Sequence, residues 1–151
     1  MTNPDFIDAL FERECWVIDP LPWQAPAEVG QYFAMDRYWR EDARLRSLYA
    51  RFADLVMKLN CYYDVRVCPG PSEEWTDNPA PERLAQWFSA CVPGGGCRYL
   101  LILIGEGALL HLDGGDLYLS VYNPDVTLQT LVDLLARAQG LFLRRSKTNQ
   151  P

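Results

Sequence analysis

The chain contains one histidine and none of the short motifs that mark common catalytic or ligand-binding sites. A lone histidine excludes a metal site built from several histidines of one chain. No Walker loop, dinucleotide-binding glycine fingerprint, nucleophile elbow or HExxH motif occurs. The run Gly94-Gly95-Gly96 follows an expected helix and precedes an expected strand, the reverse of the order in a phosphate-binding loop. The sequence therefore predicts no catalytic residue, no metal and no cofactor.

Cysteine motifs are missing as well. The five cysteines, at positions 15, 61, 68, 91 and 97, include no CxxC, and their odd number leaves one outside any set of disulfide pairs. The chain also shows no charged-then-apolar leader and no apolar run of about 18 residues. We therefore expect a cytoplasmic protein that does not contact a membrane and whose reduced thiols are mostly buried.

Positive charge is scarce, since 14 Lys and Arg residues face 20 Asp and Glu residues and the net charge is -6. Direct binding of nucleic acid depends on a basic surface, so we expect none. The acidic excess lies in residues 1–36 and 69–97, whereas residues 37–68 carry more basic than acidic side chains. An acidic protein of this kind could bind a basic protein partner. The alternative is that a net charge of this size simply keeps the protein soluble.

The most informative stretch that is present runs from Arg98 to Asn123. Residues 99–104 are apolar at every position, which predicts a central strand covered on both faces. Residues 108–112 and 117–122 should form a hairpin around Gly114-Gly115, with Leu112 opposite Leu117. One face of this hairpin is then apolar. The other, here called the mixed face, carries Leu109, His111, Tyr118, Ser120 and Tyr122. We expect one of two arrangements: either a helix covers the mixed face, or the mixed face is left partly open as a binding surface.

The rest of the chain alternates between short strand-like and helix-like patterns. Helices are expected at a short segment capped by Asn3 and at residues 41–60, 81–91 and 127–139. Further strands are expected at residues 14–18, 31–35, 61–68 and 141–143. This order predicts an α+β fold, a single domain over residues 1–145 with a polar tail at 146–151. Its mostly antiparallel sheet is centred on residues 98–104 with a 108–122 hairpin, and helices pack on it.

The long helix at 41–60 raises two questions about its outer sides. Opposite its apolar stripe lie small or apolar residues, which are Ala43, Ala50, Ala53 and Met57. They are either ordinary surface residues or a face covered by another element or a second copy of the chain. One flank carries a row of basic residues, which are Arg40, Arg44, Arg51 and Lys58. This row either pairs with nearby acids or holds a phosphate.

The proline-rich segment after residue 68 is too rich in proline for regular structure and contains Trp75 next to Glu74. Long loops with a tryptophan and several acids often serve in recognition. The alternative is that Trp75 folds back onto the core as a hydrophobic tether.

These observations favour a small acidic protein-binding module, for example an inhibitor or immunity-type protein that masks a basic toxin or nuclease. The expected partner-binding residues are Trp23, Trp39, Glu73, Glu74, Trp75 and Asp77. The alternative is a small-molecule-binding domain or enzyme that uses His111, Tyr118 and Tyr122. In an enzyme, His111 would act as a general base, and Cys91 or Cys97 would be the nucleophile.

Overall fold

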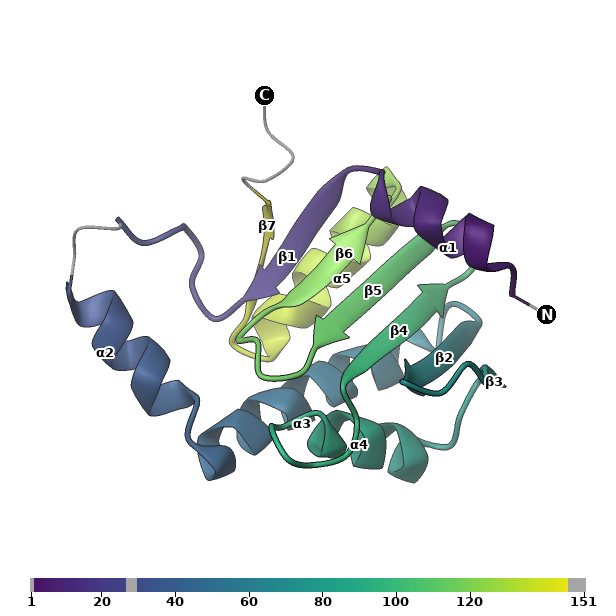
Figure 1. Ribbon diagram of the computed structural model, residues 1–151. Coiled ribbons are helices and arrows are strands. Elements are labelled where there is room, and N and C mark those ends of the chain that lie inside the picture. The colour runs from purple at the N-terminus through teal and green to yellow at the C-terminus, as the bar shows by residue number, and fades with distance from the viewer. Residues whose placement is uncertain (1, 27–29, 147–151) are drawn as a thin grey trace.

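The computed structural model describes residues 2–26 and 30–146, and within these ranges seven strands form one antiparallel sheet (Figure 1). The strand order is β3-β2-β4-β5-β6-β1-β7. The strands are β1 (Cys15–Asp19), β2 (Val65–Gly70), β3 (Thr76–Asp77), β4 (Tyr99–Ile104), β5 (Ala108–Asp113), β6 (Leu119–Tyr122) and β7 (Phe142–Arg145). The N-terminal strand β1 therefore lies between the two strands that come last in the chain.

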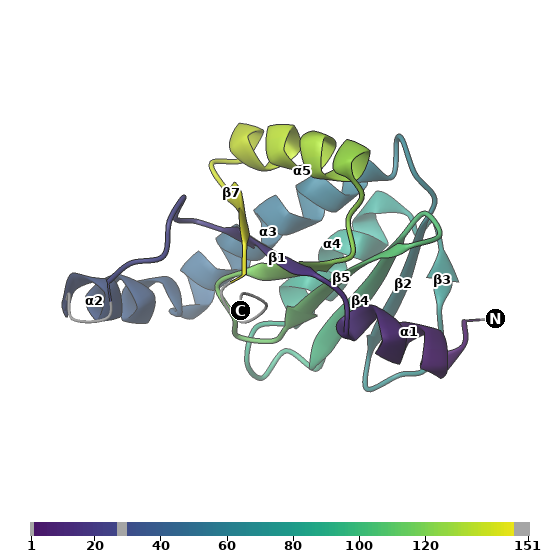
Figure 2. The same cartoon turned by 90° about the horizontal axis from the view of Figure 1, so that it is seen from above.

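Helices cover the two faces of the sheet unequally. The helices are α1 (Pro4–Phe11), α2 (Gly30–Trp39), α3 (Asp42–Leu59), α4 (Pro81–Ala90) and α5 (Val126–Ala138). Helices α3, α4 and α5 lie on one face, where they enclose the main hydrophobic core (Figure 2). Helix α1 lies on the opposite face, and α2 projects beyond the edge of the sheet. The α+β prediction is confirmed, and the described residues form a single domain.

Strand β4 occupies the centre of the sheet, as its uniformly apolar sequence predicts. Leu100 and Ile102 face the main core and are fully buried. Leu103 points to the other face, where it packs with Ile7 and Leu10 of α1. Helix α1 begins as expected, because the side chain of Asn3 accepts the backbone N–H of Asp5 and Pro4 occupies the first turn.

The hairpin forms, but its register differs by two residues from the prediction. Leu110 lies opposite Val121, not Leu119, and the connecting loop is longer than a two-residue turn. The cause is tertiary: the Tyr49 hydroxyl of α3 accepts the N–H of Gly115 at 2.9 Å and donates to the carbonyl of Asp116 at 2.8 Å. Because a shift of two preserves the alternation of side chains, the apolar and mixed faces are composed as predicted.

The expected strand at residues 31–35 is wrong, since this segment lies within α2. The side chains of Asp36 and Arg40 form an i, i+4 ion pair at 2.8 Å at the end of this helix. The expectation of no regular structure from Pro69 onward is also wrong in two places, because β2 continues through Pro69 and Gly70, and Thr76 and Asp77 form β3. The other expected helices and strands are present, with ends displaced by up to four residues, the largest change being at the start of β2.

No helix among the described residues is both long enough and apolar enough to span a bilayer.

Candidate functional site

The mixed face of the sheet is divided into two halves, and α1 seals the half over β4 and β5. The Phe11 ring lies edge-on to His111 at 5.3 Å and to Tyr122 at 4.9 Å, measured between ring centroids. A small second core is buried under this helix and consists of Ile7, Leu10, Leu103 and Leu109. The predicted covering of the mixed face by a helix is therefore confirmed for this half.

The half over β6, β1 and β7 is the floor of a cavity of about 580 Å³, here called the aromatic cavity. Val17, Ser120 and Arg144 lie side by side on this floor because they are directly opposite one another in the ladder. Cys15 and Tyr122 form the neighbouring pair. The rest of the lining includes the aromatic rings of Trp23, Tyr32, Phe33 and Tyr118.

Helix α2 forms the outer wall of the aromatic cavity without being packed into the protein. None of its residues is buried, and Phe33 is 59% exposed. Trp23, in the segment that precedes the helix, is 83% exposed. The helix is anchored near its C-terminal end, where Trp39 packs against the main core and the Arg51 guanidinium lies 5.3 Å from the ring of Trp39.

The charged end of the aromatic cavity is an ion pair between Arg144 and Asp19, with Nη2 and Oδ2 2.7 Å apart. The carboxylate is also held by the N–H of Leu21 at 2.8 Å. Nε of Arg144 is buried and has no hydrogen-bond partner among the described residues. This pair therefore adds no net charge to the cavity, and Nε of Arg144 is a hydrogen-bond donor that is left unused.

Burial favours the neutral forms of three other groups of the aromatic cavity, which are Cys15, Tyr118 and Tyr122. Burial raises the pKa of the Cys15 thiol, so this residue is not a reactive thiolate. Burial also raises the pKa of Tyr122 to about 12 and raises the pKa of Tyr118. These groups can bind through hydrogen bonds and ring contacts, but none of them has a pKa suited to acid–base catalysis near pH 7.

The three residues of the predicted ligand face do not all line the aromatic cavity, although His111 and Tyr122 both contact the Phe11 ring. Tyr118 and Tyr122 line the aromatic cavity, whereas His111 lies under Phe11 and near Tyr99. Burial lowers the pKa of His111. Cys91 and Cys97 belong to the main core on the other face of the sheet. The sheet therefore separates both possible nucleophiles from His111, the expected general base.

The six predicted partner-binding residues fall into separate places. Trp23 lies at the aromatic cavity, and Trp39 anchors α2 to the core. Trp75 is half-buried and packs against the second core under α1, as the tether alternative predicts. Glu73 and Glu74 are exposed beside it, near β3 at the far edge of the sheet. A partner that contacts both Trp23 and Glu74 would have to reach across the sheet.

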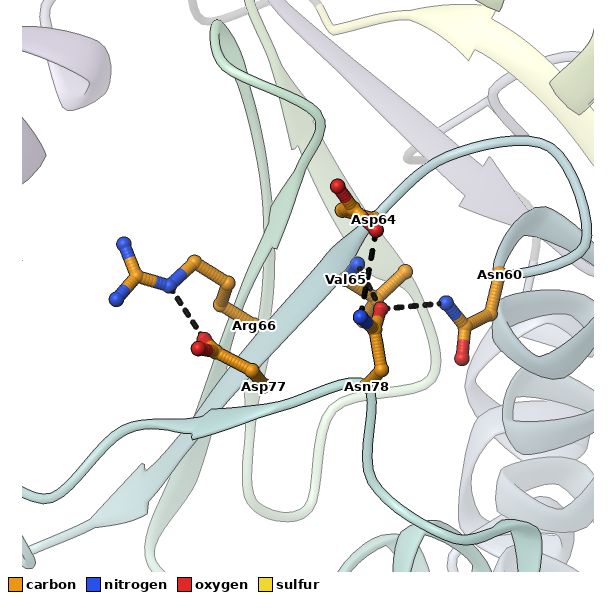
Figure 3. Close-up of polar contacts among 6 residues, drawn as sticks. All are labelled: Asn60, Asp64, Val65, Arg66, Asp77 and Asn78. Carbon is orange, nitrogen blue, oxygen red and sulfur yellow. Dashed lines mark hydrogen bonds and ion pairs between the residues drawn. The ribbon is translucent and has the colours of Figure 1, made fainter.

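Asp77, the remaining predicted partner-binding residue, takes part in a local polar network (Figure 3). Its carboxylate lies 2.7 Å from Nε of Arg66 on the paired strand β2. The neighbouring Asn78 accepts the N–H of Val65 at 2.9 Å and an amide N–H of Asn60 at 2.8 Å. These contacts hold β3 against the sheet, which gives Asp77 a structural role in addition to any role in binding.

The outer sides of α3 are mostly accounted for within the chain. Ala43 and Ala50 are exposed, but Ala53 is fully buried, because α4 packs against this flank. Arg46, two turns earlier on the same flank, donates to the Ser89 hydroxyl of α4 at 2.8 Å. On the basic flank, Arg40 and Arg44 pair with Asp36 and Glu41, and Arg51 donates to the carbonyl of Gln139. Lys58 is exposed.

The residues of the aromatic cavity that the sequence analysis missed include Asp19, Tyr32, Phe33 and Arg144. Tyr32 and Phe33 were hidden by the incorrect strand prediction. Asp19 and Arg144 are 125 residues apart, and no local pattern indicates that they meet. No protein-family model, curated protein or solved structure was found to match the chain. The function is therefore inferred from the geometry.

Proposed function

We propose that the protein binds another protein and that the partner docks on the aromatic cavity and α2. The observation that carries this proposal is that α2 has no buried residue although it presents Phe33 and Tyr38, both more than half exposed. An isolated helix of ten residues is marginal in water, so this one gains stability from whatever covers its aromatic side. Exposed aromatic side chains that border a concave surface are typical anchors of protein interfaces.

We further propose that the partner is basic. Residues 1–36 contain seven acidic side chains and one basic one. Helix α1 borders the aromatic cavity through the contact between Phe11 and Tyr122. It carries exposed Asp5 and Asp8, and exposed Glu12 follows directly after it. The negative electrostatic potential of these acidic side chains accelerates the approach of a basic protein. The aromatic rings of the cavity supply area to bury and a surface on which a cationic side chain stacks. An inhibitor or immunity-type protein that masks a toxin or nuclease is one form of this activity.

A photo-crosslinking amino acid at Phe33, in the full chain expressed in its native host, tests the proposal. The crosslinked protein is identified by mass spectrometry, purified, and titrated against the wild type by calorimetry. Trp23→Ala and Phe33→Ala should each raise Kd by about tenfold or more, as expected for anchor residues. Leu134→Ala is the matched control, since Leu134 is 61% exposed but lies on α5 in the helical layer. Equal affinity of all three variants would contradict the proposal.

A small ligand is the second candidate, because about 580 Å³ lies within the range of small-molecule sites. Native mass spectrometry of protein purified from its host distinguishes the two functions. A retained small molecule that is lost in Tyr118→Ala would favour this second function, whereas an unliganded mass together with a crosslinked partner favours protein binding.

A further inference from the structure

A second cavity, of about 860 Å³, lies where α4 ends and β4 begins, away from the aromatic cavity. Its lining includes Cys91 and Cys97, whose Sγ atoms are 3.2 Å apart. Both cysteines are free. They are 1% and 9% exposed, so the two thiols are buried from bulk solvent and meet one another at the wall of the cavity.

The backbone holds the two thiols together. Cys91 caps α4, and the chain then turns back so that the N–H of Cys97 donates to the carbonyl of Ala90 at 3.1 Å. Gly95 closes this turn through a hydrogen bond from its N–H to the carbonyl of Val92 at 2.9 Å. A Cβ at Gly95 would lie only 2.4 Å from the Ala90 carbonyl oxygen, so the turn requires glycine there. The meeting of the thiols therefore follows from a specific, tightly built connection.

The two thiols differ in their readiness to ionise. The hydrogen bond that the Cys91 thiol donates lowers the pKa of Cys97, and this effect outweighs burial, which acts in the opposite direction. The same shared hydrogen bond, together with burial, raises the pKa of Cys91. Cys97 is thus the residue that becomes a thiolate first, and Cys91 is the neighbouring thiol that can attack the Cys97 sulfur once it is oxidised.

We propose that Cys91 and Cys97 form a redox-active dithiol, which a peroxide oxidant converts into an intrachain disulfide. The Cys97 thiolate attacks one peroxide oxygen, the O–O bond breaks, and a sulfenic acid and one water are formed. Cys91 then attacks the Cys97 sulfur, and the S–S bond forms as a second water leaves. Overall, two thiols lose two protons and two electrons, which reduce one hydrogen peroxide to two waters. The sulfurs need to approach by only about 1 Å to reach the bonding distance.

The disulfide would tie the end of α4 to the start of the central strand β4. It closes a loop of seven residues, Cys91 to Cys97, which is short but removes conformations from the unfolded chain. Oxidation should therefore stabilise the helix–strand connection and stiffen the wall of the second cavity. This inference is independent of protein binding at the aromatic cavity.

Tryptic mapping tests the proposal cleanly because of where the basic residues fall. Cleavage after Arg83 and Arg98 places both cysteines in one peptide, residues 84–98, and leaves Cys61 and Cys68 in separate peptides. The reduced full chain is treated with hydrogen peroxide, alkylated with iodoacetamide and digested. Peptide 84–98 should be about 2 Da lighter than its reduced form, unalkylated, and restored by dithiothreitol. The Tm of the oxidised protein should rise by roughly 5 °C.

Two variants serve as controls. Cys61→Ser removes the exposed thiol and should leave the oxidation of peptide 84–98 unchanged. Cys97→Ser should abolish it, and Cys91→Ala provides a second test should Cys97→Ser fail to fold. The proposal is overturned when peptide 84–98 is recovered doubly alkylated while Cys61 is oxidised, or when its disulfide links it to the Cys68 peptide.

Discussion

Over β4 and β5 the mixed face is sealed by α1, whereas over β6, β1 and β7 the same face is the floor of the aromatic cavity. The two covering helices explain the difference. Helix α1 buries Ile7 and Leu10, and its Phe11 ring contacts the sheet, so it closes a small core. Helix α2 has aromatic residues but no apolar stripe that reaches the sheet, and none of its residues is buried. One half of the face thus forms part of a packed core, whereas the other is the half on which we propose that a partner docks.

The largest effect on the free energy of unfolding should come from truncating a side chain that is buried in the sealed half. Leu109 is fully buried beneath α1, so Leu109→Ala leaves a cavity and should lower the free energy of unfolding by about 2–5 kcal/mol. Urea denaturation monitored by circular dichroism measures the change. A loss below about 1 kcal/mol would mean that α1 does not form a packed core with the sheet.

The second-largest effect on the free energy of unfolding should come from breaking the ion pair at the end of the aromatic cavity. Asp19→Asn removes the charge that faces Arg144, and both side chains are at most 21% exposed, so a loss of about 1–3 kcal/mol is expected. Asp133→Asn is the matched control, because its pair with Arg137 is more exposed and should be worth only about 0.3–0.5 kcal/mol. Equal losses in the two variants would show that the floor of the cavity is as well solvated as the outer surface.

The pKa of His111 reports on how well α1 seals its half. Burial lowers this pKa in the folded state below about 6.5, the value of an exposed histidine. The unfolded chain therefore binds the proton more readily, and this contribution to stability is complete above pH of about 6.5 and is lost as the pH falls through the folded pKa. Since His111 is the one histidine of the chain, its imidazole signals in an NMR titration are unambiguous.

The variant Phe11→Ala tests this explanation in the same NMR titration. Removal of the ring should admit solvent to the His111 imidazole and raise its pKa toward the ordinary value. Phe33→Ala, in the open half, should leave the titration unchanged. A wild-type pKa at or above 6.5 would contradict the sealed environment described for this half.

The smallest effect is expected on the outer side of the aromatic cavity. Phe33→Glu places a charge where the ring is already 59% exposed, so the free energy of unfolding should change by no more than about 0.5 kcal/mol. The measurement is again urea denaturation. A loss of several kcal/mol would show that α2 is packed in solution and that the two halves are not different in kind.

The sealed half was more accessible to prediction than the open one. The apolar run at 99–104 and the alternation around His111 indicate a buried strand and a two-faced hairpin, because these features are local. The register required knowledge of Tyr49, which holds the loop at Gly115 from another layer. Trp23 could be named as a site residue because it is a tryptophan in a proline-rich segment, and Tyr118 and Tyr122 because they belong to the mixed face.

The remainder of the aromatic cavity was out of reach of sequence patterns. Helix α2 lacks the apolar stripe by which an amphipathic helix is normally identified, so its QYFAM segment was mistaken for a strand. The meeting of β1 with β6 and β7 depends on long-range pairing, and the period of a strand carries no information about its partner. Asp19 and Arg144 could therefore be placed together only by the fold.

The position of β1 between β6 and β7 has a consequence for how the protein is made. A ribosome releases β1 early, but both of its neighbours are synthesised about a hundred residues later, and Asp19 waits for a partner 125 positions away. Until then the nascent chain carries an apolar strand with both edges unpaired, a state that attracts chaperones and other unfinished chains. The last strand to emerge is therefore also the one that completes the sheet.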